Sequence, residues 1–132
     1  NWGYELASGQ RTFAHRLVAE TGVDLVHGHS SHHPRGSEVH RGKLILYGCG
    51  DFINDYEGIG GHQGYRDDLR LMYFPTCDLN TGRLVNLTVV PLQMFRFRLR
   101  RAGKADTRWL AATLNAVFPA PEHSYRVEPD GT

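Results

Sequence analysis

The 132-residue sequence has little cysteine, little excess charge of either sign and no long apolar run. Its two cysteines, Cys49 and Cys77, are too few for a disulfide scaffold; they favour two free thiols, with a single disulfide as the alternative. Fifteen Lys and Arg against fourteen Asp and Glu leave a net charge of +1, which argues against a general nucleic-acid-binding surface. The longest apolar runs, Leu44–Tyr47 and Leu71–Phe74, are far shorter than the ~20 residues that cross a bilayer, so we expect no membrane span.

The length and composition of the sequence are typical of one globular domain, or of a piece of one. Hydrophobic residues make up 40% of the chain, too many for a disordered segment. The sequence opens on Asn1 without a methionine, and we expect that this marks a cut inside a larger folded protein.

The first half of the chain predicts a helix, a strand and a hairpin. Ser8 is a suitable N-cap, and Gly22 is a suitable C-terminal stop, so we predict a helix over residues 9–21. A short β-branched segment then predicts a strand over residues 23–27, followed by a polar loop over residues 28–36. Two further strands, at residues 37–40 and 43–47, flank Arg41-Gly42.

The second half predicts a long exposed loop, two long strands and a second helix. The loop covers residues 56–68, where the neighbouring Asp67 and Asp68 are interpreted as a solvated charge pair. Apolar periodicity predicts strands at residues 69–79 and 83–99, joined by a turn at residues 80–82. Asp106 is a suitable cap for a helix over residues 107–117. The fold class is mixed α/β, with one domain over residues 1–118 and a loose tail over residues 119–132.

Four of the eight histidines lie within seven residues, directly after the first predicted strand: His27, His29, His32 and His33. The carboxyl ends of strands are where open α/β sheets bind their ligands. Neutral imidazole is a ligand for Zn, Mn, Fe and Ni, and a loop can turn two or three rings inward. The alternative is a solvated histidine-rich turn.

Carboxylates and further histidines are candidates for the rest of this metal site. Asp51, Asp55 and Glu38 are candidates for the remaining oxygen ligands. His27 is either part of the core wall or a group that orients a ligand. His62 lies in the glycine-rich loop, where it either reaches over the site as a lid residue or is simply solvated.

Several short motifs follow one another in a specific order with specific gaps: Gly28-His29-Ser30-Ser31-His32-His33-Pro34, then Gly36-Ser37-Glu38-Val39, Gly42-Lys43-Leu44-Ile45-Leu46-Tyr47 and Gly50-Asp51-Phe52. This order resembles the CapA family, named for a poly-γ-glutamate capsule biosynthesis protein and similar to the calcineurin-like metallophosphoesterases. The resemblance runs from about Asn1 to Leu79. His40 stands where the family more often has Tyr, so no role carries over to it.

The resemblance implies an α/β/β/α sandwich, with a mixed sheet flanked by helices and a two-metal centre at the sheet edge. By position, His29 and His32 match the paired histidines expected to bind divalent Mn, Fe or Zn, and Asp51 matches a residue close to the metals. His33 and His62 are our candidates for proton transfer. The chain looks like the carboxyl-terminal half of such a protein. We therefore expect it to bind metal weakly and to be inactive unless the missing amino-terminal half or a second chain supplies the other ligands.

Three readings of function follow. The first is metal-assisted hydrolysis or transfer at a phosphoester in the full-length protein. The second is a non-catalytic subunit of a polymer-synthesis or export assembly that binds anionic polyglutamate through its arginines and a structural metal. The third is a stand-alone domain with a single zinc ion. The arginines concerned are Arg96, Arg98, Arg100 and Arg101, and Phe95 and Phe97 are interleaved with the first two. An ordinary exposed strand face is favoured over a phosphate or nucleic-acid surface.

Half a sandwich also leaves one face of its sheet uncovered. We expect this to expose Leu25, Ile45 and Leu46, and therefore to drive oligomerisation or pairing with the missing half. The location of the protein stays open between the cytoplasm and the surface of a bacterial cell.

Overall fold

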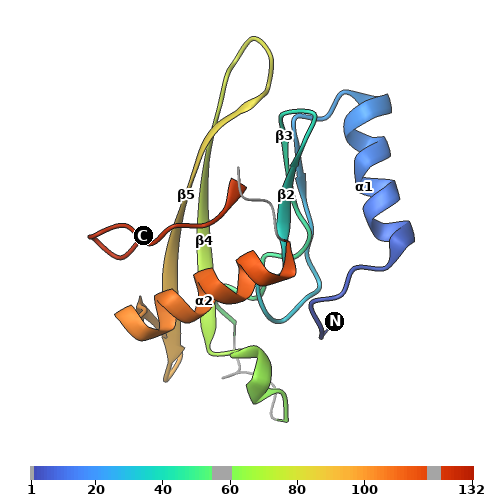
Figure 1. Cartoon of the computed structure of the whole chain (residues 1–132). Coiled ribbons are helices and arrows are strands. Elements are labelled where there is room, and N and C mark those ends of the chain that lie inside the picture. Colours follow the sequence, from blue (N-terminus) through green and yellow to red (C-terminus); the bar gives the residue numbers. More distant parts are fainter. Residues whose placement is uncertain (1, 55–60, 119–122) are drawn as a thin grey trace.

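The computed structural model describes residues 2–54, 61–118 and 123–132, and it shows a mixed α/β fold with two small sheets (Figure 1). The elements in chain order are α1 (Ser8–Thr21), β1 (Leu25–His27), β2 (Ser37–His40), β3 (Lys43–Leu46), the 3₁₀ helix η1 (Gln63–Tyr65), β4 (Leu69–Cys77), β5 (Leu84–Phe95), β6 (Arg98–Arg101) and α2 (Lys104–Val117).

The first sheet has the strand order β1-β3-β2, with β1 parallel and β2 antiparallel to β3. Helix α1 packs on this sheet, where Ala14 and Val18 meet Ile45 and Tyr47 in one buried cluster. Gly22 ends α1 in the left-handed conformation, with φ 74°, as the sequence predicts. The predicted helix, strand and hairpin of the first half are confirmed to within two residues at each end.

The second sheet is antiparallel, with the order β4-β5-β6, and α2 crosses one face of it (Figure 1). Leu69 and Leu71 of β4 pack against Leu110 and Leu114 of α2 in a second buried cluster. The far end of the β4–β5 hairpin, around residues 78–83, extends beyond the helix.

The predicted single strand over residues 83–99 is wrong. The chain turns at Arg96 and Phe97, and β6 then pairs back on β5 with Phe95 opposite Arg98. Both turn residues have positive φ, 50° and 58°, as in a two-residue hairpin turn. Such turns usually carry Asn or Gly, and neither residue is present here, so the apolar alternation continues through the turn without a break.

The predicted helix caps also differ from the structure. Ala7 rather than Ser8 precedes the first turn of α1, and Gly103 precedes α2, in neither case with a side-chain cap. Asp106 lies inside the first turn of α2, where it forms an ion pair with Arg66. The helix begins three residues earlier than expected, so Asp106 lies within its first turn rather than at its cap.

The expected uncovered apolar patch does not form. Ile45 is 0% exposed and Leu46 is also buried, while Leu25 is half-buried. Helix α1 covers Ile45, which removes the reason we gave for oligomerisation. Association with the missing part or with a second chain stays a prediction.

The C-terminal segment connects the two halves of the fold. The Tyr125 hydroxyl hydrogen-bonds the Ser37 hydroxyl of β2 at 2.6 Å, and the Asn115 side chain of α2 bonds both the N–H and the C=O of Tyr125. A cavity of about 390 Å³ lies between this segment, β2, β5 and α2. In the described part of the chain, neither helix has the length and apolarity that a bilayer crossing requires.

Candidate functional site

The polar loop after β1 is held against the end of β3 by backbone hydrogen bonds. Gly28 donates to the Leu46 carbonyl, Cys49 donates to the Gly28 carbonyl, and Arg35 donates to the Gly48 carbonyl. A Cβ at Gly28 would lie 2.5 Å from the Tyr47 carbonyl oxygen, so only glycine allows this approach. The loop that carries the histidines is thereby fixed at the carboxyl ends of the parallel strands β1 and β3.

His32 and Asp51 lie together at this edge. His32 Nδ1 is 3.1 Å from Asp51 Oδ2, with both side chains about one-fifth exposed. The Asn54 amide donates to the same carboxylate oxygen at 3.2 Å. A carboxylate accepts only, so His32 Nδ1 donates to Asp51, and in a neutral ring the lone pair is then on Nε2. A histidine oriented in this way is a typical metal-binding arrangement.

His33 lies beside this pair and is completely buried. Its Nδ1–H donates to the Pro34 carbonyl at 2.9 Å, and its Nε2 accepts the Gly3 N–H at 3.1 Å. Burial lowers the pKa of His33 below its ordinary value, with nearby Arg35 and His32 acting in the same direction. Both ring nitrogens are therefore engaged in the neutral form. The proton-transfer role of His33 stays a prediction, and it requires one of these bonds to open.

Aromatic rings surround the histidines. Trp2 stacks on His62 with ring centroids 4.1 Å apart, and it lies 5.4 Å from His32. Tyr65 stacks on His33 at 4.8 Å, and Tyr4 meets the same ring edge-on. His62 is thus brought to the site from the distant glycine-rich loop, through Trp2.

The other predicted ligands are not part of this group. His29 and His27 are exposed, and Asp55 lies outside the described residues. Within the described ranges, no group of three or more His, Cys, Asp or Glu side chains is arranged to hold a metal ion. The structure therefore unites His32, His33 and Asp51 with His62, and it leaves His29 on the same loop but apart from them.

Glu38 takes part in a different network. Its carboxylate accepts hydrogen bonds from Tyr47 and Arg11, and it pairs with His15 of α1. Burial acts to raise the pKa of Glu38, but these bonds outweigh it and hold the pKa below the usual value. The residue thus helps to attach α1 to the sheet.

Cys49 and Cys77 are unpaired, as we predicted. Burial raises the pKa of the Cys49 thiol to about 11, so this neighbour of the site is a neutral thiol at physiological pH.

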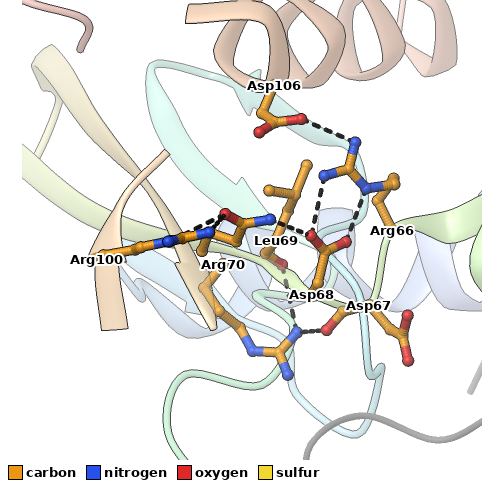
Figure 2. Close-up of polar contacts among 8 residues, drawn as sticks. Arg66, Asp67, Asp68, Leu69, Arg70, Arg100 and Asp106 are labelled. Carbon is orange, nitrogen blue, oxygen red and sulfur yellow. Dashed lines mark hydrogen bonds and ion pairs between the residues drawn. The ribbon is translucent and has the colours of Figure 1, made fainter. Parts of the chain in front are cut away.

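The loop that carries His62 ends in an ion-pair network (Figure 2). Arg66 donates two bonds to Asp68, at 2.7 and 2.9 Å, and its third nitrogen pairs with Asp106 of α2 at 2.9 Å. Gln93 of β5 donates to Asp68 at 2.7 Å. Our interpretation of Asp67 and Asp68 as a solvated charge pair is wrong for Asp68, which joins this loop to β5 and α2.

Residues 1–56 match the model of a family described as bacterial capsule synthesis protein PGA_cap. Two curated proteins from strains of Mycobacterium tuberculosis, each described as a probable polyglutamine synthesis accessory protein, are 54% identical to the chain over 117 residues. The chain is thus similar to the PGA_cap family over its first 56 residues. The alignment with these two mycobacterial proteins covers 89% of the chain and 30% of each relative. The chain therefore spans about a third of the length of each relative rather than the expected half. The predicted resemblance to the CapA capsule proteins is confirmed.

The segment matched by PGA_cap includes the whole histidine loop and Asp51. It excludes His62 and Tyr65, which the tertiary structure adds to the site from outside the matched residues. Sequence reasoning missed the roles of Trp2 and Tyr65 beside the histidines. The signal for Tyr65 was a tyrosine in a polar, glycine-rich loop.

The burial of His33 leads to a prediction about pH. Its pKa is lower in the folded chain than the ~6.5 of an unfolded chain, so its contribution to stability is complete above that value. That contribution is lost as the pH falls from there through the folded-state pKa. We expect His33→Gln to lose less stability than wild type between pH 7.5 and pH 5, measured by urea unfolding. The exposed control His27→Gln should follow the wild type; a His33→Gln curve with the wild-type pH dependence would contradict the prediction.

Proposed function

We propose that this chain is part of a protein for the synthesis of a glutamyl capsule polymer, and that the full-length protein performs metal-assisted hydrolysis or transfer at a phosphoester. The capsule role is supported by the PGA_cap match and by relatives described as polyglutamine synthesis accessory proteins. In this proposal, the two small sheets and their helices are part of a metallophosphoesterase-like α/β/β/α sandwich.

The observation that carries the catalytic part is the His32–Asp51 pair at the carboxyl ends of β1 and β3. Ligand sites in α/β sheets lie at this edge. Asp51 orients the His32 ring through Nδ1, which directs the basic Nε2 to a metal ion. His29, three residues earlier on the same loop, offers a second imidazole if the exposed loop segment adjusts.

The donor types fit Zn, Mn or Fe, which accept imidazole and carboxylate ligands. Their number does not fill a four-coordinate site, so further ligands must come from the rest of the protein or from a second chain. A bound metal would lower the pKa of a water molecule and stabilise charge on phosphoryl oxygens. Within this chain, His29 and His32 would hold the ion and Asp51 would orient His32. His62 or His33 would exchange a proton with the substrate.

Metal content tests the proposal. We expect one or two metal ions per full-length protein by elemental analysis, and the loss of at least one in His29→Ala/His32→Ala. The matched control His27→Ala/His123→Ala removes two exposed histidines and should keep the metal. Hydrolysis of a simple phosphodiester should follow the metal content.

Absence of metal from the full-length protein, or equal loss from both double variants, would contradict the metal site. A full-length protein that supports polymer synthesis without metal would favour the non-catalytic polymer-binding alternative.

A further inference from the structure

The β5–β6 hairpin carries a concentration of positive charge that the proposed metal site does not use. Residues 95–105 contain five basic residues and no acidic residue, although the whole chain has a net charge of only +1. Arg96, Arg98 and Arg100 are exposed, as are two neighbouring aromatic side chains, Phe95 at 50% and Phe97 at 53%. In the described part of the chain, none of these arginines forms an ion pair.

Phe95 and the network of Figure 2 hold two of the guanidinium groups in place. The guanidinium carbons of Arg96 and Arg100 lie 5.2 and 4.8 Å from the centre of the Phe95 ring. Arg100 also donates two hydrogen bonds to Gln93 Oε1, at 3.2 and 2.8 Å. Since Gln93 donates to Asp68, Arg100 is connected through Gln93 to the Arg66–Asp68 pair.

The strand register sets the spacing of the charges. Arg98 lies opposite Phe95, and Arg100 lies opposite Gln93, so these four residues share one face of the hairpin. Residues two apart on a strand are about 6.6–6.8 Å apart. An extended chain that carries a carboxylate at a similar interval can meet each guanidinium in turn, with the paired hydrogen bonds that arginine forms with carboxylates.

We propose that this basic hairpin face (Arg96, Arg98 and Arg100 around Phe95) binds the carboxylate form of a glutamyl polymer, in preference to its neutral amidated form. The identity of the polymer in this proposal rests on the proposed capsule role. The guanidinium groups over Phe95 support it against a nucleic acid. They lie over Phe95, one of the two exposed rings on which a base could stack.

Fluorescence anisotropy of the full chain with labelled ten-residue oligoglutamate tests the proposal, with oligoglutamine of equal length as the neutral probe. We expect oligoglutamate to bind at least tenfold more tightly than oligoglutamine, with an affinity that falls as salt rises. Arg96→Gln/Arg98→Gln should weaken oligoglutamate binding at least tenfold. The control Arg41→Gln/Arg83→Gln removes two exposed charges near the other end of the fold and should change the affinity less than twofold.

Equal binding of the two oligomers, no binding of oligoglutamate, or equal losses in the two double variants would overturn the proposal. Tighter binding of single-stranded DNA or of anionic phospholipid vesicles than of oligoglutamate would overturn it as well. His32→Ala should retain oligoglutamate binding, so a failed metal site and a failed polymer face are distinguishable.

Discussion

Replacing Asp51 by alanine is expected to lower the metal affinity of the full-length protein by about 10–100-fold, the usual effect of removing a carboxylate that orients a metal-binding histidine. In the structure this carboxylate accepts from His32 Nδ1 and from Asn54. Without it, the ring loses the bond that fixes both its orientation and its tautomer. Titration calorimetry with Zn²⁺ or Mn²⁺ measures the change.

Two variants make this test sharper. Asp51→Asn keeps an oxygen that accepts from His32, so its loss of affinity should be smaller than that of Asp51→Ala. Asp130→Ala removes an exposed carboxylate in the C-terminal segment and should leave the affinity unchanged. An unchanged affinity in Asp51→Ala, beside a clear loss in His32→Ala, would show that Asp51 does not orient the ligand. Complete loss of an ion in Asp51→Ala would instead identify Asp51 as a ligand itself.

Replacing Ile45 by alanine is expected to lower the free energy of unfolding by about 2–5 kcal/mol, as for other buried Ile to Ala changes. Ile45 is 0% exposed in the centre of the first sheet, where it packs against Ala14 and Val18 of α1. The variant leaves a cavity that these small residues cannot fill. Urea unfolding of the chain, followed by circular dichroism, measures the loss.

Ile53→Ala is the matched control for this substitution. The same side chain is removed, but Ile53 is 62% exposed, so we expect a change of less than about 0.5 kcal/mol. Equal losses in the two variants would mean that α1 does not cover the sheet in solution. In that case Ile45 would be available to a second chain, as the sequence led us to expect.

Local patterns predicted much of the first half of the fold and part of the site. Gly22 ends α1, and the β-branched segment that follows forms β1, because both features depend on neighbouring residues alone. The same local order places the histidines directly after a strand and Asp51 five residues after the end of β3. Because β1 and β3 are parallel neighbours, their ends meet at one edge, and His32 lies within hydrogen-bonding distance of Asp51.

Prediction failed where distant partners decide the conformation. The turn at Arg96 and Phe97 has no turn residue, and the pairing of β6 with β5 maintains its positive φ angles. Asp106 is a reasonable helix cap by sequence, yet it lies in the first turn of α2 and pairs with Arg66, forty residues earlier. Glu38 is a plausible metal ligand by type, but Arg11, His15 and Tyr47 surround its carboxylate.

The sequence by itself determined the chemistry that is available: a histidine-rich loop after β1, an aspartate after β3, and two arginines interleaved with phenylalanines. These follow from residue type and short spacing. Only the tertiary structure decided which of these groups meet. It buried both nitrogens of His33, left His29 exposed, and brought His62 to the site through Trp2. It also placed Arg96 and Arg100 over one ring. The reason is that contacts between residues far apart in the chain depend on how sheets and helices pack, which short sequence patterns do not encode.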